Sequence, residues 1–183
     1  LNTDSLKSNF ESIKIPLTID NVLQNIDITK QIYDNAQKLI IDEQKVDSDA
    51  YNKCLEYSNQ IITFLDKLNP FEINRIKVNI KTIYYISAEI LVRTVGLHMN
   101  RPNGFEEREK GILFTSVAHL QKVLNVDPFD ASAKELFKVV MIYLTIFNPN
   151  ANENLQLLKN ILMVNPCDYQ VHYNIGFMYQ RVN

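Results

Sequence analysis

The residues able to act as nucleophiles, acids, bases or metal ligands are few and scattered. The three histidines, His98, His119 and His172, form no H-E-x-x-H motif, and no carboxylate stands at a metal-binding spacing from them. We expect His172 to occupy a packing position in a helix. The four glycines form no phosphate-binding loop and no nucleophile elbow. The sequence therefore predicts no catalytic residues, no metal site and no cofactor, and it indicates that the chain by itself is not an enzyme.

The two cysteines and the net charge indicate in which compartment the protein works and which partners it binds. Cys54 and Cys167 are far apart and form no C-x-x-C motif, which favours a reduced, intracellular and cytoplasmic protein. Because the chain opens at Leu1 rather than Met, we expect a fragment or a processed product. Nineteen basic and 21 acidic side chains give a formal charge of -2, so no nucleic acid partner is expected. The longest apolar runs are too short to span a membrane.

A local stripe of basic residues is the one feature that could still contact RNA. Its basic side chains recur over 75–93, interleaved with two tyrosines, in a pattern that RNA contact would need. The apolar periodicity of the same segment favours helix packing instead. The residues concerned are Arg75, Lys77, Lys81, Tyr84, Tyr85 and Arg93.

Long helices must carry whatever function the chain has. Apolar residues make up 46% and charged residues 22% of the chain, and only 4 Gly and 6 Pro interrupt it, which favours an all-α protein. Residues 1–16 lack an apolar stripe and are expected to be an irregular lead-in. We expect Ser48 or Asp49 to cap the second helix and the charge run 106–110 to be a solvated first turn. The expected helices cover about 17–41, 49–68, 71–99, 106–125, 130–147 and 152–164, and a last one begins at 168.

Three proline turns separate some of these helices in the same way. The segments 66–72, 124–130 and 163–168 each place Asn or Asp before Pro and an acid two residues after it. The residue before proline disfavours a helix, and the acid can cap the next one, so each segment predicts a stop followed by a start. The prolines are 58 and 38 residues apart, and the second spacing is near the roughly 34-residue period of helix-pair repeats.

The last turn carries a residue pattern that resembles the tetratricopeptide repeat family. Pro166 closes one repeat, His172 takes the large position of the next, Ile175-Gly176 match the Leu-Gly pair, and Tyr179 matches the Tyr. We expect Gly176 to allow a close helix approach and Tyr179 to fill the space beside it. Further packing positions fall on Asn154, Leu158 and Ile161 before Pro166, and on Ser116, Leu120 and Val123 before Pro128.

The resemblance to tetratricopeptide repeats also implies an overall fold. It is strongest over 152–183 and weakest over 17–99. It implies an α-solenoid of stacked antiparallel helix pairs, forming one right-handed superhelical domain over 17–183. Within this domain, 17–99 would be divergent helical pairs, and 106–183 tetratricopeptide-like repeats of which the last is truncated. A generic helical bundle is the alternative architecture.

The same resemblance implies a protein-binding groove. Its inward positions are Glu135, Val139 and Ile142 in one repeat, and Tyr173 and Phe177 in the next. Some members of the family hold a peptide carboxylate with Lys and Asn at such positions, but these residues are mostly apolar. They therefore favour an apolar groove for a peptide or helix of a partner protein. Alternatively, Tyr173 and Phe177 pack against further helices of the parent protein.

Two other functions stay open at this stage. The chain could be the helical arm of a larger enzyme, such as a glycosyltransferase or methyltransferase, where it would position substrate or mediate dimerisation. It could also self-associate through its terminal helix.

Overall fold

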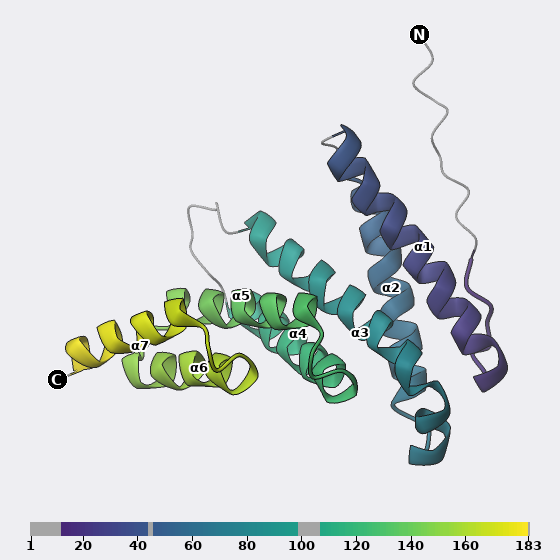
Figure 1. The fold of residues 1–183 in the computed structure, drawn as a ribbon. Coiled ribbons are helices and arrows are strands. Elements are labelled where there is room, and N and C mark those ends of the chain that lie inside the picture. Colours follow the sequence, from purple (N-terminus) through teal and green to yellow (C-terminus); the bar gives the residue numbers. More distant parts are fainter. Residues whose placement is uncertain (1–11, 44–45, 99–106, 183) are drawn as a thin grey trace, which may run out of the picture. The chain divides into compact units, whose positions relative to one another are not determined.

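A computed structural model describes residues 12–43, 46–98 and 107–182 of the chain (Figure 1). These residues form seven α-helices and no strand, which confirms the predicted all-α class. Residues 12–18 precede the first helix without helical structure, and residues 1–11 of the expected lead-in lie outside the described part of the chain. The helices are α1 (Ile19–Glu43), α2 (Ser48–Leu65), α3 (Pro70–His98), α4 (Glu107–Val126), α5 (Ala131–Phe147), α6 (Ala151–Val164) and α7 (Tyr169–Val182).

Side-chain caps decide where these helices begin. Thr18 before α1 and Asn69 before α3 each exchange two hydrogen bonds with the residue three positions later. The Asn150 side chain accepts two main-chain N–H groups at the start of α6. These bonds satisfy donors that a first helical turn otherwise leaves without an acceptor. Main-chain N–H groups at the starts of α2, α5 and α7 also donate to the carboxylates of Asp47, Asp130 and Asp168.

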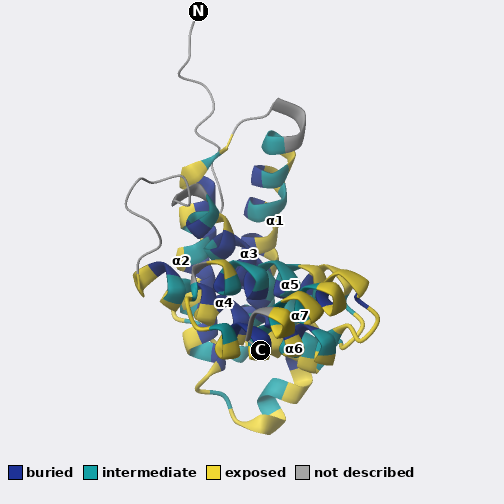
Figure 2. Ribbon diagram, turned by 90° about the vertical axis from the view of Figure 1, so that its left-hand side faces the viewer, coloured by how far each residue is buried: buried dark blue, intermediate teal, exposed yellow. Residues whose placement is uncertain are grey.

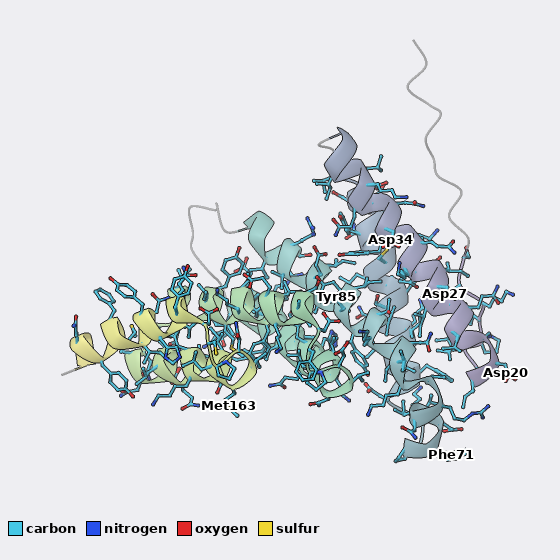
Figure 3. The ribbon with its side chains drawn as sticks, viewed as in Figure 1. Asp20, Asp27, Asp34, Phe71, Tyr85 and Met163 are labelled. Carbon is cyan, nitrogen blue, oxygen red and sulfur yellow. The ribbon has the colours of Figure 1, made fainter. Side chains whose placement is uncertain are left out.

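Two expected caps are corrected by the structure. The cap of α2 is Asp47 rather than the expected Ser48 or Asp49, because its carboxylate accepts the Ala50 N–H at 2.9 Å. At the first proline turn Asn69 is the cap, so α3 begins directly at the proline, whose missing N–H costs nothing at the first helical position. Phe71 follows on the exposed side of the first turn of α3 (Figure 3).

The structure divides the chain inside its longest helix. Two compact units, Leu1–Ile86 and Ser87–Asn183, meet at a boundary within α3. The sequence predicts one helical-repeat domain over 17–183, and the boundary between the two units falls inside that span. The helix α3 spans 29 residues and contributes a different half to each unit.

In the unit Leu1–Ile86, α1 packs against α2. The buried Cys54 thiol lies 3.7 Å from the Thr29 carbonyl oxygen, to which it donates, between these two helices. Tyr84 of α3 is buried near the end of α2. Burial, together with the charge of Asp66 and the hydrogen bond to it, raises the pKa of Tyr84 to about 12. The first half of α3 is thus fixed to the end of α2 by a tyrosine that stays protonated.

In the unit Ser87–Asn183, α4, α5 and α6 each pack against the helix that follows. Ser116 of α4 is fully buried, and its hydroxyl donates to the Ala88 carbonyl oxygen of α3 at 2.9 Å. Along α7, Val171 is the only buried residue among 169–180, so most of this helix is exposed or half-buried (Figure 2). The last described helix of this unit, α7, is therefore packed on one side only and buries little of its surface there.

A repeated burial pattern links α2, α4 and α6. In each helix the residues 12, 8 and 5 positions before the proline of the following turn are buried. Their spacing places them on one helical face, and the first of each set is a small or medium-sized polar residue. The sequence predicts the sets in α4 and α6, and the structure shows a third set at the same positions in α2. The sets are Ser58–Ile62–Leu65, Ser116–Leu120–Val123 and Asn154–Leu158–Ile161.

The charge run at the start of α4 is not entirely solvated. Glu109 is buried, although the whole run was expected to face water. It stands four residues before the fully buried Leu113, so helical periodicity turns it toward the packed face of α4. Position along the helix, rather than charge, decides its burial.

We expect the close approach at Ser116 to limit the size of the side chain there. Ser116→Leu should lower the free energy of unfolding by about 2–4 kcal/mol, because it removes a buried hydrogen bond and overpacks the contact with Ala88. Ser116→Ala should cost about 1 kcal/mol. Urea unfolding followed by circular dichroism measures both. Thr115→Leu, at the exposed neighbouring position, is the control, and an equal loss there would refute the explanation.

Candidate interaction surface

The outward side of α5 carries a line of mainly apolar side chains. The predicted groove residues Glu135, Val139 and Ile142 lie on it at helical spacing and are exposed or half-buried. Ile146 extends the line by one turn, with 61% of its surface exposed. Sequence reasoning missed Ile146, although its four-residue step from Ile142 is the signal that places it there.

The outward side of α7 carries aromatic residues in the same periodicity. Tyr169, Tyr173 and Phe177 follow one another at four-residue steps and are 85%, 74% and 48% exposed. We call these three residues the aromatic stripe. Tyr173 and Phe177 were predicted for the groove, whereas Tyr169 was not, and its spacing from Tyr173 is again the missed signal. Three large rings on one exposed helix face form a surface that a partner can contact.

The opposite sides of both helices explain why these faces point outward. α5 buries Phe137, Val140 and Leu144, and α7 buries Val171. These side chains lie on the sides where α5 packs against α4 and α6 and where α7 packs against α6. Because packing uses the sides that meet the neighbouring helices, the outward faces stay exposed or half-buried.

A buried ion pair fixes the start of α7 beside α5. Lys138 Nζ of α5 lies 2.8 Å from Asp168 Oδ2, and the two side chains are only 17% and 7% exposed. The hydrogen bond from Lys138 lowers the pKa of Asp168, and the N–H groups of Val171 and Gln170 lower it further. The same bond raises the pKa of Lys138, aided by the charge of Asp168, by Glu135 and by Tyr169. Glu135 and Tyr169, the first residues of the two outward faces, thus both interact electrostatically with Lys138.

The predicted repeat-packing residues divide into buried and exposed groups. Leu158 and Ile161 are 4% and 1% exposed and lie in the core, as a packing position requires. Pro128 and Pro166 are exposed in their turns. His172 is also exposed, and its Nε2 lies 2.9 Å from the Pro166 carbonyl oxygen, so it contacts the preceding turn.

The three remaining packing residues lie on the less buried part of α7. Ile175 is half-buried and Gly176 is exposed. Apart from its chain neighbours and the backbone of its own helix, no described atom lies within 4 Å of a Cβ placed on Gly176, so the close approach predicted there is not present among the described residues. Tyr179 is 43% exposed, with Lys159 Nζ 5.6 Å from the centre of its ring.

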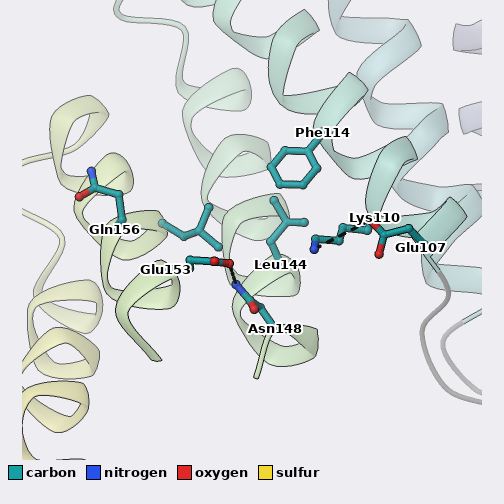
Figure 4. Close-up of a pocket in the computed structure, with 8 residues that line it drawn as sticks. Glu107, Lys110, Phe114, Leu144, Asn148, Glu153 and Gln156 are labelled. Carbon is teal, nitrogen blue, oxygen red and sulfur yellow. Dashed lines mark hydrogen bonds and ion pairs between the residues drawn. The ribbon is translucent and has the colours of Figure 1, made fainter. Parts of the chain in front are cut away.

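A separate hollow of about 360 Å³ lies among α4, α5 and α6 (Figure 4). Phe114, Leu144 and Leu157 supply its apolar lining. Glu153, also in the lining, accepts a hydrogen bond of 2.8 Å from Asn148 Nδ2. None of the predicted groove residues lines it. Leu144 lies roughly 140° around α5 from Val139, so the hollow and the outward line occupy different sides of this helix.

The groups that could do chemistry stay apart in the described residues. Within residues 12–43, 46–98 and 107–182, no three His, Cys, Asp or Glu side chains form a group able to hold a metal ion. Burial and the charge of Asp47 together raise the pKa of the Cys54 thiol to about 12, so this thiol is protonated at neutral pH. None of the described helices is both long and apolar enough to cross a membrane.

Comparison with known proteins adds no family. No protein-family model matches the sequence, and no curated protein sequence matches it. The tetratricopeptide resemblance therefore stays a prediction, and the observations that bear on function are those of the chain's own surface.

We expect the ion pair to give the protein an acid-sensitive contribution to stability. Because folding lowers the pKa of Asp168 from 3.8, its contribution is complete above that pH and is lost as pH falls through the folded value. Because folding raises the pKa of Lys138 from 10.5, its contribution is complete below that pH and is lost only in strong base. Stability from this pair should thus be constant between about pH 5 and 9.

Lys138→Met tests this expectation. It should lower the free energy of unfolding at pH 7 by about 2 kcal/mol and flatten its decline toward pH 3, because Asp168 loses its main partner. Urea titrations at stepped pH measure both effects. Lys134→Met, on the same helix and without that pair, is the control. An unchanged acid decline in Lys138→Met would show that other carboxylates cause it.

Proposed function

We propose that this chain is a non-enzymatic protein-interaction module that binds a peptide or helix of a partner protein on the outward faces of α5 and α7. The observation that carries the proposal is the row of large exposed side chains on these faces. Tyr173 is 74% exposed and Ile146 is 61% exposed, although each could bury most of its surface against a partner. Fully burying one such side chain contributes about 1.5–3 kcal/mol.

The tetratricopeptide resemblance supports the same surface. If α5 and α7 are the first helices of successive repeats, their outward faces line the concave side of a right-handed superhelix, where proteins of that family commonly bind partners. The repeated burial pattern of α4 and α6 agrees with second helices in such pairs. The ion pair between Lys138 and Asp168 supports a fixed relation between the start of α7 and α5. A surface held in this way loses little conformational entropy when it binds.

The proposal predicts which exposed apolar residues matter. Peptides selected from a random display library against the full chain should bind less tightly to Phe177→Glu and to Ile146→Glu, by at least about tenfold, because a buried carboxylate opposes the contact. Fluorescence anisotropy of a labelled selected peptide gives the dissociation constants. Circular dichroism checks that each variant keeps its helices.

Met163→Glu is the matched control. Met163 is 81% exposed and projects from α6 rather than from α5 or α7 (Figure 3). The same change of an apolar residue to glutamate should leave binding within about twofold of the original chain. Failure to select any peptide, or an equal loss in Met163→Glu, would contradict the proposed surface.

A further inference from the structure

The aromatic stripe is uncharged along its described length. Residues 169–180 of α7 contain no Asp, Glu, Lys or Arg. Helical periodicity places the exposed Gln170 and Gln180 on the same side as Tyr173. The stripe therefore presents aromatic faces together with hydroxyl and amide donors, and residues 169–180 add no formal charge to it.

The size of the stripe argues against a second copy of the chain as its occupant. An aromatic side chain buries about 150–250 Å² when fully covered, so three rings supply at most about 450–750 Å². Tyr169, Tyr173 and Phe177 are already partly covered, so they supply less. A stable interface buries about 800 Å² on each partner. The stripe suits a small ligand better than a second folded chain.

The donors of the stripe distinguish two kinds of peptide. In an α-helical ligand the main-chain carbonyl groups are already bonded within the helix and cannot satisfy the donors of Tyr173 or the glutamines. In a polyproline II segment the carbonyl groups have no internal partner and are free to accept. Proline rings also pack flat on aromatic faces, as in other aromatic-lined sites for such peptides.

The length of the stripe fits a short extended segment. Tyr169 and Phe177 are eight residues apart, which corresponds to about 12 Å along the helix. Four residues of polyproline II cover the same distance at about 3.1 Å each. Such a segment is ordered before it binds, so a few ring contacts suffice to hold it.

From these observations we infer that the aromatic stripe, with Gln170 and Gln180 beside it, binds a proline-rich extended segment of a partner protein. The inference rests on the proposed function and names the class of peptide that this part of the surface takes. The rings supply the apolar contact, and the tyrosine hydroxyl and glutamine amide groups donate to the carbonyl groups of the segment.

Binding of a fluorescein-labelled octaproline peptide to the full chain tests the inference. Octaproline should bind at least about tenfold more tightly than a Gly-Ser peptide of equal length. Tyr173→Ala and Phe177→Ala should each weaken it at least about fivefold. Tyr173→Phe, which removes only the hydroxyl, should weaken it less than Tyr173→Ala. Fluorescence anisotropy gives the constants, and circular dichroism checks the fold.

Tyr179→Ala is the matched control on the same helix. Tyr179 is 43% exposed but lies about 200° around α7 from Phe177, away from the stripe. Its removal should leave octaproline binding unchanged. An equal loss in Tyr179→Ala and Tyr173→Ala would overturn the inference, as would equal binding of octaproline and the Gly-Ser peptide.

A second ligand separates this inference from the proposed function. If an amphipathic Leu-Lys helical peptide binds in a Tyr173-dependent way and octaproline does not, the inference fails and the proposed function stands. If neither binds and the display library also gives no peptide, both fail. A dimer that forms with rising concentration and is lost in Tyr173→Ala would assign the stripe to a second copy and overturn the inference.

Discussion

Packing between helices that are neighbours in the sequence is the constraint on which the unit Ser87–Asn183 depends. α4 packs against α5, α5 against α6 and α6 against α7, so each helix must carry apolar residues on the sides that meet its neighbours. The buried sets before the prolines, such as Ser116–Leu120–Val123 in α4, meet this demand with one residue per helical turn. Since folding uses only those sides, the outward faces are free to carry exposed rings without loss of the core.

Asp168 fixes the start of the last helix, α7, relative to α5. Its carboxylate accepts the Val171 N–H at 3.1 Å and pairs with Lys138 at 2.8 Å, so one side chain both starts α7 and fixes that start beside α5. A cap alone would begin the helix but leave its direction to the turn. A buried pair alone would hold the turn without ordering the first N–H groups. The combination holds the first turn of α7, which carries Tyr169, beside α5 and thereby sets where the aromatic stripe begins.

Local patterns in the sequence predict the helices well and their surroundings less well. The proline turns and the apolar periodicity gave every helix, because both signals act within one or two turns of the chain. The caps at Asp47 and Asn69 were missed because neighbouring residues could make similar bonds, and only geometry decides between them. The burial of Glu109 and the absence of a close neighbour at Gly176 depend on helices distant in sequence. Tyr169 and Ile146 lie four residues from Tyr173 and Ile142, so helical periodicity alone predicts them, but they are not positions of the tetratricopeptide pattern.

The exposure of α7 connects its stability to its proposed role. Among its described side chains only Val171 is buried, and a helix of 14 residues is marginal in water without tertiary contacts. The contact with α6 and the Asp168 cap therefore supply much of what orders it. A ligand that covers Tyr173 and Phe177 binds the ordered helix and not the unfolded one, so by mass action it stabilises α7 as it binds. Because α7 buries few of its own side chains, its stability depends more on a bound partner than that of the other helices in its unit.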